Sequence, residues 1–134
     1  MTVVDSSVVV DYLLGRPGAA FVAFERVLVE EGDVAAPDVL VFEVLAVLRR
    51  AVQRGELEGR RAEAAIEDLG DLPLLLYPAL TLRRRAWELR ENCTIGDGLF
   101  AALAQLLDEP LMTVDRRLAA AARAHAGVTV VEPI

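Results

Sequence analysis

The most informative absence from this 134-residue sequence is lysine, because all fourteen basic residues are arginine. Without lysine the chain can form neither a Walker-type phosphate loop, whose glycine pattern is also missing, nor the Schiff base of a lysine-dependent enzyme. Cysteine and histidine each occur once, as Cys93 and His125. One cysteine excludes an internal disulfide and a multi-cysteine zinc site. One histidine, expected on a helix surface, gives little support to a histidine-based catalytic or metal centre.

Long uncharged apolar runs are also absent, so no segment reaches the roughly eighteen residues that a membrane span requires. The N-terminal stretch MTVVDSSVVVDYLLG is interrupted by Asp5 and Asp11 and is framed by no basic leader or cleavage site, which argues against an export signal. The single cysteine fits a reducing compartment. With 54% hydrophobic and 5% aromatic residues, we expect one soluble, cytoplasmic domain over residues 1–134, with no membrane association.

The net charge of −7 counts against a nucleic-acid partner, because proteins bind polyanions through cationic surfaces. The arginines are nevertheless clustered, and the guanidinium fork suits phosphate groups. The alternative is that each cluster is the solvated face of an amphipathic helix, paired with nearby glutamates. The clusters are Arg49, Arg50 and Arg54; Arg60 and Arg61; Arg83, Arg84, Arg85 and Arg90; and Arg116 and Arg117.

Short β-rich runs alternate with longer helical patterns along the whole chain, without a linker or repeat. The predicted strands cover residues 2–5, 33–37, 73–78, 111–114 and 128–134. The predicted helices cover residues 6–15, 18–31, 38–54, 59–70, 79–91, 95–108 and 115–126, the first of them capped by Ser6 or Ser7. Strands that alternate with helices predict a parallel sheet covered on both faces. We therefore expect an α/β sandwich with about five strands.

One carboxylate stands in an otherwise apolar run, VLVFEVLAVL at residues 39–48. On a helix, the residues three and four positions from Glu43 are all apolar, so its side chain emerges on an apolar face. An isolated buried carboxylate costs several kcal/mol, and chains usually protonate it, replace it, or provide a cation or metal. Glu43 therefore needs a partner from elsewhere in the chain.

Three further acids stand at predicted junctions between strands and helices. Asp5 ends the first strand, Asp115 follows the fourth, and Asp97 lies in the first turn of a helix. Ligands of open parallel sheets bind beyond the carboxyl ends of the strands. Each acid could instead cap a helix, and Thr94 with Asp97 matches a capping box. Capping does not explain Glu43, whereas one shared site for a hard cation, Mg²⁺ or Mn²⁺, explains all four acids.

Four sequence blocks together resemble PIN-domain ribonucleases of the VapC-like toxin type, in order and approximate spacing over nearly the whole chain. The blocks are VVDSSVVVDYL, FEVLAVLRR, TIGDGLFAALAQ and LMTVDRRLA. The resemblance implies a catalytic and metal-binding quartet of Asp5, Glu43, Asp97 and Asp115, with Ser7 and Thr113 as supporting hydroxyls. The chain departs from its relatives at Gly96-Asp97-Gly98, where they often carry bulkier residues.

The resemblance further implies the PIN fold, a three-layer sandwich whose parallel sheet has the order 3-2-1-4-5. It implies metal-dependent cleavage of single-stranded or looped RNA, and silencing by a co-encoded antitoxin. The absence of a histidine pair favours hydrolysis that leaves a 3′-hydroxyl and a 5′-phosphate. A rim of carboxylates attracts cations, so we expect the antitoxin to dock a basic segment there. The high apolar content predicts a homodimer.

Two alternatives remain open from the sequence. An α/β phosphatase or phosphoacceptor also places acids at strand ends, but the phosphatase type needs D-x-D, where this chain has Asp5-Ser6-Ser7, and a receiver domain needs a lysine. The second alternative is a catalytically inactive PIN-like domain that only binds RNA or a partner, with its acids serving as helix caps.

Overall fold

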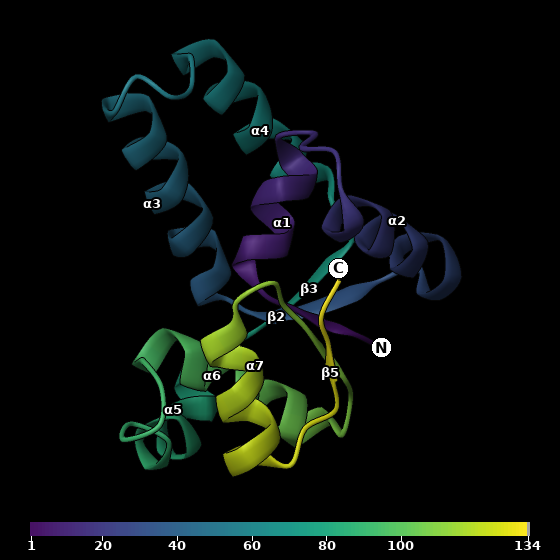
Figure 1. Cartoon of the computed structure of the whole chain (residues 1–134), viewed down its shortest axis with the longest axis vertical. Coiled ribbons are helices and arrows are strands. Elements are labelled where there is room, and N and C mark those ends of the chain that lie inside the picture. The colour runs from purple at the N-terminus through teal and green to yellow at the C-terminus, as the bar shows by residue number, and fades with distance from the viewer. Residues whose placement is uncertain (134) are drawn as a thin grey trace.

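The computed structural model describes residues 1–133 and contains one sheet of five strands in the order β3-β2-β1-β4-β5 (Figure 1). Every neighbouring pair is parallel. The strands are β1 (Val3–Val4), β2 (Val34–Pro37), β3 (Leu74–Tyr77), β4 (Leu111–Met112) and β5 (Val130–Val131). The expected strand number, direction and order are confirmed.

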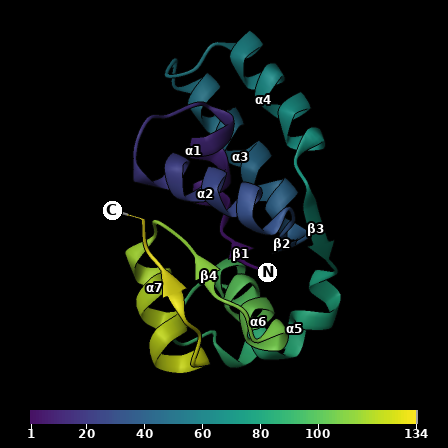
Figure 2. The same ribbon diagram turned by 90° about the vertical axis from the view of Figure 1, so that its right-hand side faces the viewer.

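Among the described residues, seven α-helices cover the sheet on both faces, which confirms the expected sandwich. Figure 2 shows α1, α2, α3 and α4 on one side of the sheet and α5, α6 and α7 on the other. The helices are α1 (Ser6–Leu13), α2 (Ala19–Glu31), α3 (Val39–Gln53), α4 (Gly59–Asp71), α5 (Ala79–Glu88), α6 (Ile95–Leu107) and α7 (Arg116–Ala121). Within residues 1–133, none of them is long and apolar enough to cross a membrane.

The core lies around the three central strands and helix α6. Strands β1, β2 and β4 are buried along their whole length, whereas the edge strand β3 leaves Leu75 and Leu76 exposed. Helix α6 is buried at seven consecutive residues, Gly98–Ala104. A parallel sheet covered by helices on both faces requires such apolar runs. This core fixes the relative positions of the carboxyl ends of β1 and β4 and the start of α6.

The observed elements differ from the predicted ones mainly at their ends. The strands predicted at 2–5 and 111–114 are each observed with two residues, Val3–Val4 and Leu111–Met112, and Asp5 and Asp115 are the N-caps of the helices that follow them. The strand predicted at 128–134 is observed at Val130–Val131, and Ile134 lies outside the described residues. The last predicted helix ends in a π-helical turn, η1 (Ala122–Ala126). His125 lies exposed in η1, as predicted for a surface residue.

Candidate functional site

Asp5 is the buried anchor of the site, with 6% of its surface exposed. Its Oδ1 accepts a hydrogen bond from the Ser6 backbone N–H at 2.9 Å. Its Oδ2 accepts from two hydroxyls, Ser7 Oγ and Thr113 Oγ1, each at 2.8 Å. Burial raises the pKa of Asp5, the three hydrogen bonds oppose that rise, and the charge of Asp115 adds to it. The structure therefore brings Ser7 and Thr113 onto the same carboxylate oxygen, as two donors that fix its position.

Asp5 is also the N-cap of α1, whereas the sequence favoured Ser6 or Ser7. The position of this N-cap follows from where β1 ends. The chain leaves β1 with Asp5 still extended, and its N–H still bonds to the Met112 carbonyl at 2.9 Å, so Asp5 is the last residue outside the helix. The two serines fall inside the first turn, where their hydroxyls are free to contact carboxylates.

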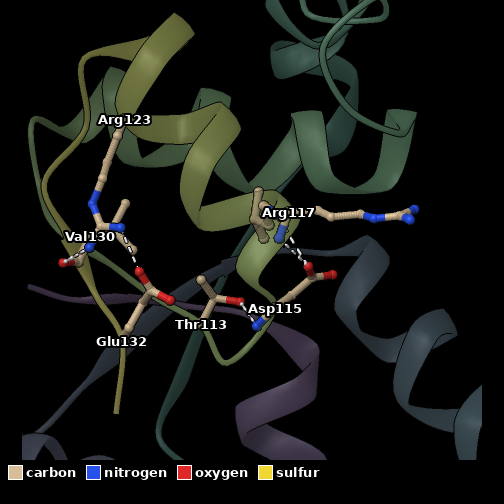
Figure 3. A network of polar contacts seen from close by, with 7 residues as sticks. Thr113, Asp115, Arg117, Arg123, Val130 and Glu132 are labelled. Atoms are coloured by element: carbon tan, nitrogen blue, oxygen red, sulfur yellow. Dashed lines mark hydrogen bonds and ion pairs between the residues drawn. The ribbon is translucent and has the colours of Figure 1, made fainter. Parts of the chain in front are cut away.

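Asp115 caps α7, and its backbone N–H bonds to Thr113 (Figure 3), whose hydroxyl in turn bonds to Asp5. Its Oδ1 accepts from the backbone N–H groups of Arg117 and Leu118, at 2.9 and 3.2 Å. Its own N–H donates to Thr113 Oγ1 at 2.9 Å, and the same hydroxyl donates to Asp5. In Figure 3 the Arg117 side chain extends away from the carboxylate. The fully buried Thr113 therefore couples the ends of β1 and β4.

Glu43 projects from the second turn of α3 and is half-buried. Its Oε1 accepts from Ser6 Oγ at 3.0 Å, a contact that the sequence analysis missed because Ser6 was considered only as a helix cap. Burial raises the pKa of Glu43, the Ser6 hydrogen bond opposes the rise, and the charges of Asp5 and Asp97 add to it. The hydroxyl of Ser6 thus favours the charge of Glu43, whereas the two other acids disfavour it.

Asp97 lies in the first turn of α6, where its N–H donates to Thr94 Oγ1 at 3.1 Å. Thr94 is therefore the cap of α6, as the capping-box pattern predicted. Burial, then the charges of Asp115 and Asp5, raise the pKa of the Asp97 carboxyl to about 6, while the Thr94 hydrogen bond lowers it. Asp97 is the acid whose charge the surroundings disfavour most plainly, because burial and the charges of Asp115 and Asp5 outweigh the interaction with Thr94.

Taken together, the four carboxylates form an acidic rim beyond the carboxyl ends of β1 and β4, and each pKa shift described above includes the charge of at least one other member. We use "acidic rim" for Asp5, Glu43, Asp97 and Asp115. None of the ion pairs in residues 1–133 involves these four side chains. Unpaired like charges of this kind disfavour one another unless a proton or a cation is taken up.

The rim fits a hard divalent cation by the chemistry of its donors, which are carboxylate and hydroxyl oxygens. In the structure, however, residues 1–133 contain no three His, Cys, Asp or Glu side chains close enough together to hold a metal ion. Asp5 and Asp115 also serve as helix caps. Helix capping and membership of a cation site therefore apply to the same two residues.

No arginine side chain within residues 1–133 forms an ion pair with a rim carboxylate. Arg49 and Arg50 line a hollow of about 450 Å³ on the outer side of α3, together with the exposed Phe42 and Leu45. A second hollow, of about 410 Å³, shares Leu45 and Arg49 and continues to Ile66 of α4. We call the side of α3 that carries Phe42, Leu45, Arg49, Arg50 and Gln53 its outer face.

Comparisons with known proteins match the chain over nearly its whole length. The sequence pattern of the PIN domain matches residues 2–124. Ribonuclease VapC1 of Mycobacterium tuberculosis is 44% identical over 120 residues, which are 89% of each chain. Ribonuclease VapC12 of the same organism is 36% identical over 119 residues, 89% of this chain and 90% of that one.

Solved structures share the fold at low sequence identity. The VapBC2 structure from Rickettsia felis, bound to a promoter DNA fragment, matches with a TM-score of 0.71 at 12% identity and covers 99% of this chain and 98% of that one. The FitAcB structure from Neisseria gonorrhoeae matches with a TM-score of 0.65 at 19% identity and the same coverage.

Proposed function

Because this chain belongs to the PIN-domain family, we propose that it is an endoribonuclease that hydrolyses RNA phosphodiester bonds with Mg²⁺ or Mn²⁺, as the toxin of a toxin-antitoxin pair. The observation that carries the proposal is the convergence of Asp5, Glu43, Asp97 and Asp115 from four separate elements on one rim. Relatives named as VapC ribonucleases at 36–44% identity support the choice of RNA.

The protein's own residues would hold the cation in a defined arrangement. Asp5 is the most constrained donor, because Ser7 and Thr113 fix one of its oxygens. Asp97 and Glu43 approach from the opposite helices α6 and α3 and retain some exposure, so they can adjust. A bound divalent cation would offset charge on the phosphate and lower the pKa of a coordinated water.

The products should carry a 3′-hydroxyl and a 5′-phosphate. Cleavage through the RNA 2′-hydroxyl, without a metal, usually relies on a pair of proton-transferring groups such as histidines. The only histidine of the chain, His125, is exposed in η1. End-group labelling of the cleaved RNA distinguishes the two routes, since a 2′,3′-cyclic phosphate product would contradict hydrolysis by water.

The decisive experiment measures cleavage of a mixed RNA pool by purified protein, with and without Mn²⁺ and with an EDTA control. We expect cleavage that requires the cation and is abolished by Asp5→Asn. The matched control is Asp68→Asn, an exposed acid of α4 outside the rim. RNA binding without cleavage would instead establish an inactive binding domain, and release of phosphate from a small phosphomonoester without RNA cleavage would establish a phosphatase.

We further propose that a cognate antitoxin silences the enzyme by placing a basic segment against the acidic rim, where arginine or lysine would pair with the unpaired carboxylates. The VapBC2 structure supports an antitoxin partner for this fold. Neutralising every basic residue of the toxin-binding segment should release the ribonuclease. Unchanged inhibition by that neutralised antitoxin contradicts this mode of control.

Self-association is the third part of the proposal. Large apolar side chains stay exposed on several helices, including Phe42 at 70%, Leu80 at 72% and Leu106 at 64%. Contiguous exposed apolar surface favours association, and a two-fold dimer is the commonest closed form. Light scattering at micromolar concentration should therefore give the mass of two chains, and a strictly monomeric mass contradicts the homodimer.

A further inference from the structure

Gly96, immediately before Asp97, is the glycine at which an added side chain would collide with the acidic rim. A Cβ built on Gly96 would lie 2.8 Å from Oε2 of Glu43 and 3.8 Å from its Cδ, with no other neighbour within 4 Å outside its own helix. Non-bonded carbon and oxygen atoms do not approach this closely without a shift. Gly96 is helical, so backbone freedom does not explain the glycine here.

The two carboxylate oxygens of Glu43 therefore have different surroundings. Oε1 accepts a hydrogen bond from Ser6 Oγ at 3.0 Å, on the side of α1. Oε2 lies against the first turn of α6, in the space that the missing Gly96 side chain leaves open. Ser6 Oγ also lies 3.5 Å from Asp5 Oδ1, so the same hydroxyl stands between two members of the rim.

Other helical glycines show that this close approach is specific to Gly96. Gly59 and Gly70 of α4 have nothing within 4 Å of an added Cβ. Gly98, on the other side of Asp97, would meet the Ala86 carbonyl oxygen of α5 at 3.3 Å, which is helix packing and involves no rim carboxylate. The two glycines around Asp97 thus have separate roles, one toward Glu43 and one toward α5.

We propose that Gly96 and Ser6 are positioning residues, which together hold the Glu43 carboxylate against the first turn of α6, where it can contribute to binding a cation. The metal part of this inference rests on the proposed function. A methyl group at position 96 would move the flexible end of Glu43 and leave the backbone in place, because only Glu43 atoms oppose it. Alanine is also the better helix former, so Gly96→Ala should fold normally.

The first test needs no metal and observes Glu43 directly. In protein labelled with ¹³C at glutamate carboxyl groups and freed of metal, Glu43→Gln identifies the Glu43 resonance by its loss. We expect Gly96→Ala and Ser6→Ala each to shift that resonance, and the matched control Gly70→Ala to leave it unchanged. A Glu43 resonance that is identical in wild type and Gly96→Ala overturns the inference, whatever the protein does with metals.

The second test measures Mn²⁺ binding by calorimetric titration. Gly96→Ala should weaken binding by roughly tenfold, a loss typical of residues that orient a metal ligand. The melting temperature without metal should not fall. Glu43→Asp withdraws the carboxylate by one methylene, so adding Gly96→Ala in that background should cost less than about twofold. Equal losses in both backgrounds mean that Gly96 does not act through Glu43, and overturn the inference.

The two tests also separate this inference from the proposed function. If wild type binds no Mn²⁺ while the Glu43 resonance responds to Gly96→Ala, the positioning role stands and the proposed metal-dependent activity fails. If wild type binds Mn²⁺ and cleaves RNA, but Gly96→Ala changes neither the Glu43 resonance nor the Mn²⁺ affinity, the proposed function stands and the positioning role fails.

Discussion

Phe42 and Glu43 are neighbours on α3, yet they belong to two very different surfaces. Glu43 faces the acidic rim, where Ser6 holds one oxygen and the charges of Asp5 and Asp97 act on it. Phe42 is 70% exposed and lines the apolar hollow of the outer face. Successive residues of a helix are rotated by about 100°, so one element can serve two unrelated surfaces.

The comparison shows that the two surfaces are unfavourable in different ways. Several rim carboxylates accept hydrogen bonds, but their like charges repel one another. Binding a cation or a proton reduces this repulsion. The outer face carries Arg49 and Arg50 and leaves apolar side chains such as Phe42 in water, which another macromolecule can cover. Substitutions at the rim should therefore affect RNA cleavage, and substitutions at the outer face should affect association.

The neighbouring residues of α3 should differ most in RNA cleavage. Glu43→Gln keeps the side-chain volume but removes a charged donor, and should lower the cleavage rate by at least about a hundredfold. Phe42→Ala should leave the rate within about twofold, because Phe42 is 70% exposed and its apolar side chain makes none of the hydrogen bonds of the rim. Rates in saturating Mn²⁺ provide the measurement, with circular dichroism to confirm folding. Similar losses in both variants would show that the two surfaces are not separate.

Metal linkage should distinguish Asp97 as part of a cation site from Asp97 as a structural acid. At a Mn²⁺ concentration of about a hundred times Kd, binding adds about 2.7 kcal/mol to the free energy of unfolding of the wild type. Asp97→Asn should lose most of this gain, yet melt at the same or a higher temperature in EDTA. If the variant is destabilised equally with and without Mn²⁺, and Mn²⁺ does not change the melting temperature of the wild type, Asp97 has a structural role and is not part of a cation site.

The stability of the metal-free protein should depend on Asp97 protonation. Its pKa rises from an ordinary 3.8 to about 6 on folding, so the folded chain binds this proton more tightly than the unfolded chain. The resulting stability is complete below the unfolded pKa and is lost as pH rises through about 6. Because Asp97 is only partly buried, solvent screens its charge, and the loss should be on the order of 1 kcal/mol between about pH 4 and about pH 7.

Thermal melting across this pH range, in metal-free buffer, measures the effect. Asp97→Asn should flatten the dependence, because asparagine does not titrate, whereas the exposed control Asp68→Asn should keep the wild-type slope. Asp5 and Glu43 also have raised pKa values, so some dependence should persist in Asp97→Asn. Stability that increases through pH 6 in the wild type contradicts the sign.

The smallest predicted difference concerns folding stability. Thr113→Val removes a fully buried hydroxyl that donates to Asp5 and accepts from the Asp115 N–H, and should cost about 1–2 kcal/mol. Leu45→Ala on the outer face, where Leu45 is 38% exposed, should cost no more than about 0.5–1 kcal/mol. Urea denaturation of both variants provides the measurement. An equal or larger cost for Leu45→Ala would show that the outer face supports the core.

Much of the fold could be predicted because its signals are local. Alternating apolar strands and amphipathic helices indicated a parallel sheet, and the helix starts at Thr94 and Asp115 followed from capping chemistry. The element ends were less predictable. The cap of α1 is Asp5 and not a serine, because the ladder bond from the Asp5 N–H to Met112 decides where β1 ends. That bond joins residues more than a hundred positions apart.

The sequence by itself indicated which acids to consider for the rim, because three stand at predicted junctions between strands and helices and Glu43 stands in an apolar run. Tertiary structure decided how those groups are held. Ser6 reaches Glu43 across 37 positions, Thr113 reaches Asp5 across 108, and Gly96 matters only because α3 brings Glu43 against α6. Residue types and periodicity are properties of short segments, whereas these contacts depend on how the core orients β1, β4, α3 and α6, and no short segment contains that information.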